Sequence, residues 1–184
     1  MQKDRRCAQG TDARGGADPL GSRMATRFDN RGRFRSMYVG NARRLLHAGA
    51  RKMAATAVEK ATEAGIAISV AIADAGGHLV VLERMDGGRF HTVHSATTKA
   101  VCAASNKRAT SARGAQAQEL DTAHAIGLAL AAGPERWTAM EGGCPILVDG
   151  ECIGGIGVSG GDWETDERLA RAAVESIGAS WKIA

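Results

Sequence analysis

Two histidines, His91 and His94, lie three positions apart at the start of a predicted helix. This spacing puts both imidazoles near one face of the helix. Neutral imidazole is a common protein ligand for iron and other transition metals, so both side chains are candidate metal ligands. The alternative is that one or both rings cap the helix or pack at its start, because this spacing is frequent by chance. Zinc is disfavoured, since no third and fourth ligand follows at a conventional spacing.

Two glycine groups, Gly142-Gly143 and the segment 157–161, form a second candidate site. Free backbone N–H groups beside the start of the last predicted helix can receive a carboxylate or another anion. The positive charges of Lys99 and Arg89 would complete such a binding pocket. The alternative is that the glycines only serve turn geometry, with Lys99 solvated or paired with a carboxylate. Acidic residues in the same region would repel an anion.

General acid–base chemistry is a third possibility, with Glu141 and His91 as the principal candidates. Asp166, Glu167 and His78 also have suitable side chains. These residue types are common, and carboxylates at a helix start need no catalytic explanation. The sequence contains no recognisable trio of nucleophile, base and orienting residue. It therefore leaves open whether the protein is an enzyme.

The elements that must position these residues alternate between helical and strand patterns. Residues 144–148 and 151–159 are predicted to form a hairpin around Asp149-Gly150, which is typical of a type I′ turn. The order of the elements predicts an α+β fold with a mainly antiparallel sheet. The other predicted helices are 42–64, 92–107, 119–132 and one that Asp162 or Thr165 caps, and the other predicted strands are 66–74, 78–85 and 137–140.

Small residues are concentrated where these elements would meet. The strand 66–74 alternates large residues with alanine and serine, which predicts that a helix lies close to its small face. The helix 92–107 has no clear polar face, which predicts packing between layers or against another subunit. Three glycines, Gly154, Gly155 and Gly157, leave the last strand nearly bare, so a helix, a subunit or a ligand can approach its backbone.

The 184 residues amount to one folded domain, 38–184, after a basic leader, 1–37, that is predicted to be disordered. A nucleic-acid-binding arm is the alternative for the leader, and Met24 or Met37 could be the natural start. Residues 1–36 hold nine Lys/Arg and four Asp/Glu, which leaves 15 Lys/Arg and 16 Asp/Glu for residues 37–184. The positive net charge of +4 therefore comes from the leader. The folded part has no excess of basic residues of the kind that nucleic-acid binding requires.

The remaining composition favours a cytoplasmic protein. No apolar run has membrane-spanning length, and no apolar stretch follows Arg5-Arg6 as a secretion signal requires. The four cysteines form no CxxC pair, which favours reduced thiols. In a two-residue-turn register Cys152 faces Leu147 and Cys144 faces Gly155, so a disulfide within the hairpin is not expected. A core of small residues buries little area per side chain, so we expect a homo-oligomer.

A set of ordered motifs gives the chain a resemblance to a known family. The motifs are DAGGHL (74–79), RMDG (84–87), Lys99-Ala100, GGCP (142–145), GIGVSGG (155–161) and Asp166-Glu167. Over residues 40 to 178 the chain resembles the GlcG/HbpS family, which includes haem-binding proteins and the C-terminal domain of certain cobalamin adenosyltransferases. The resemblance implies a profilin-like fold with a five-stranded sheet and helices packed on it.

The same resemblance implies that the protein binds haem, or another small molecule, as a homo-oligomer. A histidine at His91 or His94 is then a candidate axial ligand of haem iron, with Arg89, Lys99, Gly142 and Gly143 around the cofactor. The alternative is a lyase or isomerase that acts on a small carboxylate or aromatic acid through His91 and Glu141. A structural partner domain, as in the adenosyltransferase fusions, is a third reading, but the chain has no room for a catalytic companion domain.

Overall fold

The computed structural model describes residues 27–28, 34–35 and 40–182. Two short strands, β1 (Arg27–Phe28) and β2 (Phe34–Arg35), pair in antiparallel fashion. They belong to a first compact unit, and the second unit begins at Arg43. Apart from these four residues, the predicted leader 1–37 lies outside the described residues, so its disorder stays a prediction.

Within the described residues, the second unit contains one antiparallel sheet of four strands. These are β3 (Ser69–Asp74), β4 (Leu79–Arg84), β5 (Gly143–Val148) and β6 (Glu151–Ser159), in the spatial order β4-β3-β6-β5. The α+β class and the antiparallel sheet are therefore confirmed. Every neighbouring pair is antiparallel.

The fifth strand that the sequence predicts at 137–140 does not form. The hydroxyl of Thr138 accepts a hydrogen bond from the backbone N–H of Met140 at 3.1 Å, and the Thr138 carbonyl accepts one from the Cys102 thiol. Such a local side-chain bond offers the backbone an alternative to a sheet ladder. The prediction of five strands was thus wrong for this segment, and the profilin-like outline stays a prediction.

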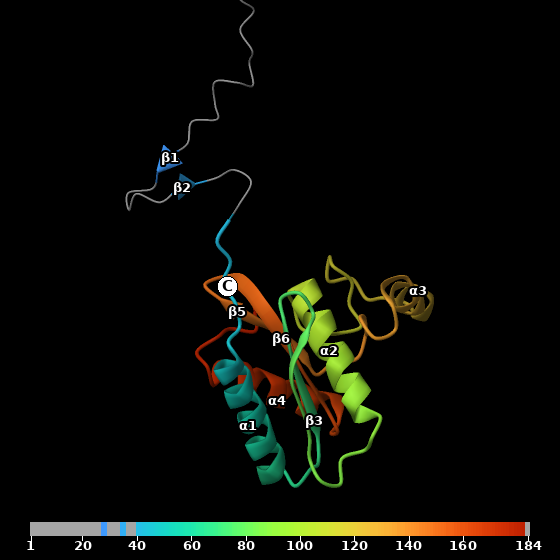
Figure 1. The fold of residues 1–184 in the computed structure, drawn as a ribbon. Helices are drawn as coiled ribbons and strands as arrows, with labels where there is room; N and C mark the ends of the chain where they lie inside the picture. Colours follow the sequence, from blue (N-terminus) through green and yellow to red (C-terminus); the bar gives the residue numbers. More distant parts are fainter. Residues whose placement is uncertain (1–26, 29–33, 36–39, 183–184) are drawn as a thin grey trace, which may run out of the picture. The chain divides into compact units, whose positions relative to one another are not determined.

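The sheet separates two layers of helix (Figure 1). Helices α1 (His47–Glu63) and α4 (Trp163–Glu175) pack on the face that carries Val70 and Ile72. Helix α2 (Thr92–Asn106) packs on the opposite face, where Ala71 and Ala73 meet Ala96 and Ala100. This confirms that a helix lies on the small face of β3.

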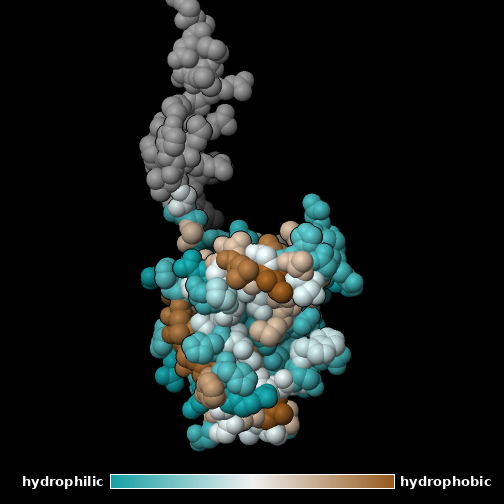
Figure 2. Space-filling view, turned by 90° about the vertical axis from the view of Figure 1, so that its right-hand side faces the viewer, coloured by the Kyte–Doolittle hydropathy of each residue, from teal (hydrophilic) through white to brown (hydrophobic). Residues whose placement is uncertain are grey.

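Helix α3 (Thr122–Ala132) follows a different pattern, because none of its residues is buried. Its side chains Ile126, Leu128 and Leu130 are all exposed. Figure 2 shows how exposed apolar surface gathers in separate patches on a mostly polar surface, as seen from one side of the molecule. None of the helices in the described residues is long and apolar enough to cross a membrane.

The hairpin β5–β6 confirms the predicted turn and corrects the predicted register. Asp149 and Gly150 both have positive φ, 50° and 77°, as a type I′ turn requires. Cys152 lies opposite Leu147 as predicted, but Cys144 pairs with Ile156 and not with Gly155, because a register shift falls between Ile146 and Leu147. Among the described cysteines, Cys102, Cys144 and Cys152 are free thiols. Burial raises the pKa of the Cys144 thiol to about 12.

Candidate functional site

Helix α2 covers two of the glycines of β6, Gly155 and Gly157, whereas Gly154 lies against Ala73 of β3. A Cβ atom on Gly157 would lie 2.1 Å from the Ala96 carbonyl oxygen, and one on Gly155 would lie 2.2 Å from the Ala100 carbonyl oxygen. Both neighbours are backbone atoms, so no side chain could move aside. The sequence left a helix, a subunit or a ligand as the partner that approaches this strand, and the structure shows that it is the helix.

Lys99 and Asp166 form a buried ion pair between α2 and α4. The Lys99 ammonium donates to Asp166 Oδ2 at 2.9 Å and to the Val158 carbonyl at 2.8 Å, and both side chains are only 5% exposed. The other carboxylate oxygen of Asp166 accepts from the Gly161 N–H at 2.9 Å. The pair thus connects both helical layers to the end of β6. The charge of Lys99 is already balanced inside the protein.

Gly142 and Gly143 lie against this ion pair, as the sequence grouping expects. A Cβ on Gly142 would lie 2.9 Å from Lys99 Nζ, and one on Gly143 would lie 2.7 Å from the Lys99 carbonyl oxygen. The Gly143 N–H donates to the Thr110 hydroxyl at 2.9 Å, and the Thr110 N–H donates to the Gly143 carbonyl at 3.0 Å. The structure therefore brings Lys99, Gly142 and Gly143 together as a tightly packed wall.

Arg89 ties the start of α2 to the glycine turn after β6. Its guanidinium donates to the Gly160 carbonyl at 3.1 Å, and its own carbonyl accepts from the Thr92 hydroxyl at 2.6 Å. Thr92 also bonds Ser69 at the beginning of β3. The segment before α2 is thus held at one end of the sheet, where β3 begins and β6 ends.

The two candidate ligand histidines occupy this end of the sheet. His91 is the N-cap residue of α2 but makes no side-chain capping hydrogen bond. Its ring meets the ring of Phe90 edge-on, with the centroids 5.8 Å apart. His91 and His94 are both exposed, and Phe90 is 79% exposed. Two imidazoles and an aromatic ring therefore face the surroundings at the start of α2.

The acid–base candidates do not all lie at this end of the sheet. Glu141 is half-buried beside Gly142, whose carbonyl accepts from the Val158 N–H, so Glu141 lies at the same sheet end as His91. His78 follows the opposite end of β3, about 17 Å away along a strand of this length. There it contacts Asp74, whose carboxyl has a lowered pKa because it accepts the His78 backbone N–H. His78 and His91 cannot serve one site.

Asp166 and Glu167 each form an ion pair with another side chain of the protein. Asp166 holds Lys99, and Glu167 pairs with Arg171 one turn along α4. The Lys99–Asp166 pair matches the alternative in which Lys99 is paired with a carboxylate, but the sequence did not identify Asp166 as the partner, since the two residues are 67 positions apart. Within the described residues, no group of three His, Cys, Asp or Glu side chains can hold a metal ion.

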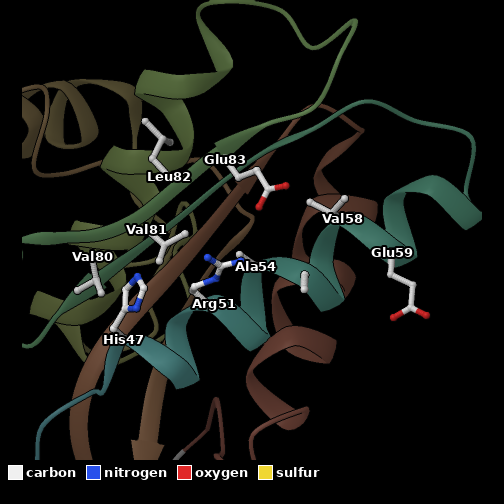
Figure 3. A pocket seen from close by; sticks show the side chains of 10 residues that line it. His47, Arg51, Ala54, Val58, Glu59, Val80, Val81, Leu82 and Glu83 are labelled. Atoms are coloured by element: carbon white, nitrogen blue, oxygen red, sulfur yellow. The ribbon is translucent and has the colours of Figure 1, made fainter.

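A groove of about 650 Å³ lies between α1 and β4, and the sequence did not predict it (Figure 3). Val58 of α1 and Val80 and Val81 of β4 line it, with His47 and Arg51 on the α1 side. His47 is exposed, as the sequence suggested for a solvent-side histidine. This groove lies across the sheet from α2 and shares no residue with the His91 end.

The comparisons with known proteins agree with the resemblance seen in the sequence motifs. The family described as "Haem degrading protein HbpS-like" matches residues 45–175. Protein GlcG of Escherichia coli K12 is 36% identical over 101 residues, which are 55% of this chain and 70% of GlcG.

Two solved structures support the same conclusion. The crystal structure of HbpS has a TM-score of 0.64 and 31% identity, covering 78% of this chain and 97% of HbpS. The structure of a PduOC:heme complex has a TM-score of 0.66 and 26% identity, covering 77% of this chain and 100% of PduOC. With its matching fold, motifs and relatives, this chain belongs to the HbpS-like family.

Proposed function

We propose that this protein binds haem, or another flat aromatic small molecule, at the sheet end where α2 begins, and that it does so as a homo-oligomer. The observation that carries the proposal is the pair of exposed imidazoles, His91 and His94, on a rigidly held helix start. Neither imidazole caps the helix or packs in the hydrophobic core. An imidazole is the axial ligand that many haem proteins use.

The donor chemistry of this sheet end fits haem. A histidine nitrogen would bind the iron, and Phe90 offers an exposed aromatic surface to a flat ring system. The carboxylates of such a ligand would meet Arg89, which keeps further guanidinium N–H groups beside the one that bonds Gly160. Haem binding by a relative supports the same assignment, since PduOC was crystallised with haem.

In this proposal the ligand is not contacted by Lys99, Gly142 or Gly143, which support the start of α2. Lys99 is 4% exposed and paired with Asp166, so it positions α2 and does not contact a carboxylate of the ligand. The two glycines allow the close packing that keeps the helix start in place. The proposed ligand contacts are therefore His91, His94 and Arg89.

A hemin titration of the purified protein tests this function. We expect saturable binding with a shift of the Soret band, and a loss of affinity of roughly tenfold or more in His91→Ala or His94→Ala if that ring bonds the iron. His47→Ala is the matched control, because His47 is an exposed helical histidine on the other face of the sheet. No Soret shift in the wild type, or wild-type affinity for hemin in both α2 variants, would overturn the proposal.

An enzyme that acts on a small carboxylate or aromatic acid is the second candidate. The observation in its favour is that Glu141 and His91 lie at the same end of the sheet, where Glu141 would act as a base and His91 as an acid. Turnover of such a compound that disappears in Glu141→Gln, while hemin binding persists, would favour this alternative.

A further inference from the structure

The groove between α1 and β4 carries opposite charges on its two walls (Figure 3). Helix α1 contributes the guanidinium of Arg51, and β4 contributes the carboxylate of Glu83. Among the described residues, none of the ion pairs includes either of these groups. Each group can therefore bind a ligand group of the opposite charge.

The pairing of β4 with β3 explains why the Glu83 side chain faces the groove. Residues directly opposite each other in an antiparallel pair point to the same face of the sheet. Glu83 pairs with Val70 and Val81 pairs with Ile72. Both partners lie in the hydrophobic core on the α1 side of the sheet. Glu83 and Val81 are therefore directed to the α1 side as well, across from the helix.

One side of α1 forms the opposite wall. His47, Arg51 and Val58 line the groove and have the spacing of residues that share one side of a helix. Between Arg51 and Val58 the lining residues are Ala54 and Ala55. An alanine side chain is a single methyl group, so the middle of the groove stays open. The volume of about 650 Å³ lies within the range of roughly 300–1,000 Å³ that small-molecule sites occupy.

The rest of the lining is largely apolar. Val80 and Val81 of β4 and Val58 of α1 are half-buried along the groove. Figure 3 shows that Glu59, the second carboxylate of the lining, points away from the groove. The groove thus presents one guanidinium, one carboxylate and an apolar wall.

We infer that this groove binds an α-amino acid with a large apolar side chain. Its carboxylate binds Arg51, whose guanidinium can donate two parallel hydrogen bonds to a carboxylate. The imidazole of His47, one helical turn before Arg51, can donate a further N–H to the same carboxylate. The ammonium group binds Glu83, and the apolar side chain lies against Val80 and Val81.

A zwitterion is the class of ligand that complements both walls. An anion without an ammonium group would bring a negative charge toward Glu83, and a cation without a carboxylate would bring a positive charge toward Arg51. The groove shares no residue with the sheet end that carries His91. This inference therefore goes beyond the proposed function and does not depend on it.

Isothermal titration calorimetry with three probes tests the inference. L-Phenylalanine has both charges, 3-phenylpropanoate lacks the ammonium group, and phenethylamine lacks the carboxylate. All three carry the same aromatic ring. We expect L-phenylalanine to bind saturably, and each analogue to bind roughly tenfold or more weakly, because each analogue leaves one wall without its counter-charge.

Variants without one charge assign the two walls. Arg51→Gln should weaken the binding of L-phenylalanine by roughly tenfold or more without weakening that of phenethylamine. Glu83→Gln should weaken L-phenylalanine similarly without weakening 3-phenylpropanoate. Lys52→Gln is the matched control, because Lys52 is exposed on α1 next to Arg51 and does not line the groove. Circular dichroism confirms that the variants are folded.

A variant that fills the groove tests where the ligand lies. Ala55→Leu places a larger side chain in the groove without changing its charge, and it should weaken L-phenylalanine by roughly tenfold or more. Ala48→Leu is the matched control, because Ala48 is also exposed on α1 but does not line the groove. It should bind as the wild type does.

Three outcomes would overturn the inference. Without saturable binding of L-phenylalanine to the wild type, Glu83 is only an inward-pointing charge of the kind that protects edge strands. Equal affinity for all three probes would contradict recognition of a zwitterion. Wild-type affinity for L-phenylalanine in Arg51→Gln, Glu83→Gln and Ala55→Leu would place the amino acid outside the groove. Hemin binding is measured separately, so none of these results decides the proposed haem site.

Discussion

The strands β6 and β4 flank β3 on its two sides, and they bury surface in opposite ways. β6 is rich in glycine, and the backbone of α2 lies directly on it. β4 carries leucine and valine, yet all six of its residues are exposed or half-buried. The comparison shows that apolar content does not decide burial in this fold. The glycine-rich strand is the buried one, because its lack of side chains lets the backbone of α2 approach its main chain closely.

The two sides also differ in what they are expected to do. The covered side fixes the start of α2 and the imidazoles on it through Lys99, Asp166 and Arg89. On the other side, β4 pairs only with β3 within the described residues, and its Leu79 and Leu82 are exposed. Substitutions on the covered side should therefore affect stability more than substitutions of the exposed β4 side chains.

The largest effect is expected for Lys99→Met on the covered side. It leaves the Asp166 carboxylate buried without its counter-charge, which costs about 3–5 kcal/mol of unfolding free energy. Urea denaturation of the variant and the wild type measures the loss. The double variant Lys99→Met/Asp166→Leu removes the stranded charge and should recover part of it. A single-variant loss below about 1 kcal/mol would mean that the ion pair is not sealed from solvent.

A smaller loss of about 1–3 kcal/mol is expected for Gly157→Ala, because the new methyl group forces α2 away from β6. Gly127→Ala is the matched control. A Cβ there would meet nothing within 4 Å, and alanine is the better helix former, so α3 should be unchanged or slightly more stable. Chemical denaturation compares the two. Equal stability of both variants would show that the close contact of α2 with β6 does not limit the fold.

The smallest effect concerns Asp162, the N-cap of α4, whose carboxylate accepts from the Thr165 N–H at 2.7 Å. This hydrogen bond lowers the pKa of Asp162 in the folded protein. Its stabilisation is therefore fully present above the unfolded pKa and is lost as the pH falls through the folded pKa. Asp162→Ala should lower the Tm by a few degrees at neutral pH and make no difference in strong acid. A Tm difference that is the same at both pH values would contradict the capping role.

Much of the fold was predictable because it depends on local patterns. The Asp149-Gly150 turn and the two faces of β3 follow from turn chemistry and periodicity, and the structure confirms both. The sequence left Asp162 or Thr165 as the cap of the last helix, and the structure shows that it is Asp162. The strand at 137–140 was wrong, because the bond from Met140 to the Thr138 hydroxyl is a local alternative that periodicity does not show. The register shift beside Leu147 has no sequence signal of its own.

The candidate site was only partly predictable. The sequence grouped Lys99, Gly142 and Gly143 correctly in space, since they lie against one another. It did not reveal that Asp166 neutralises Lys99, because this pairing depends on how α2 and α4 meet the sheet. It also gave no sign that α3, with its apolar residues, would bury none of them. Periodicity identifies an apolar helix but not the surface that covers it.

The central claim is that haem binds at the start of α2 and not in the groove beside β4. A crystal structure of the hemin complex, with the iron located by anomalous scattering, tests it most directly. We predict iron within bonding distance of His91 or His94, with the ring system against Phe90. Iron beside His47, in the groove between α1 and β4, would contradict the account.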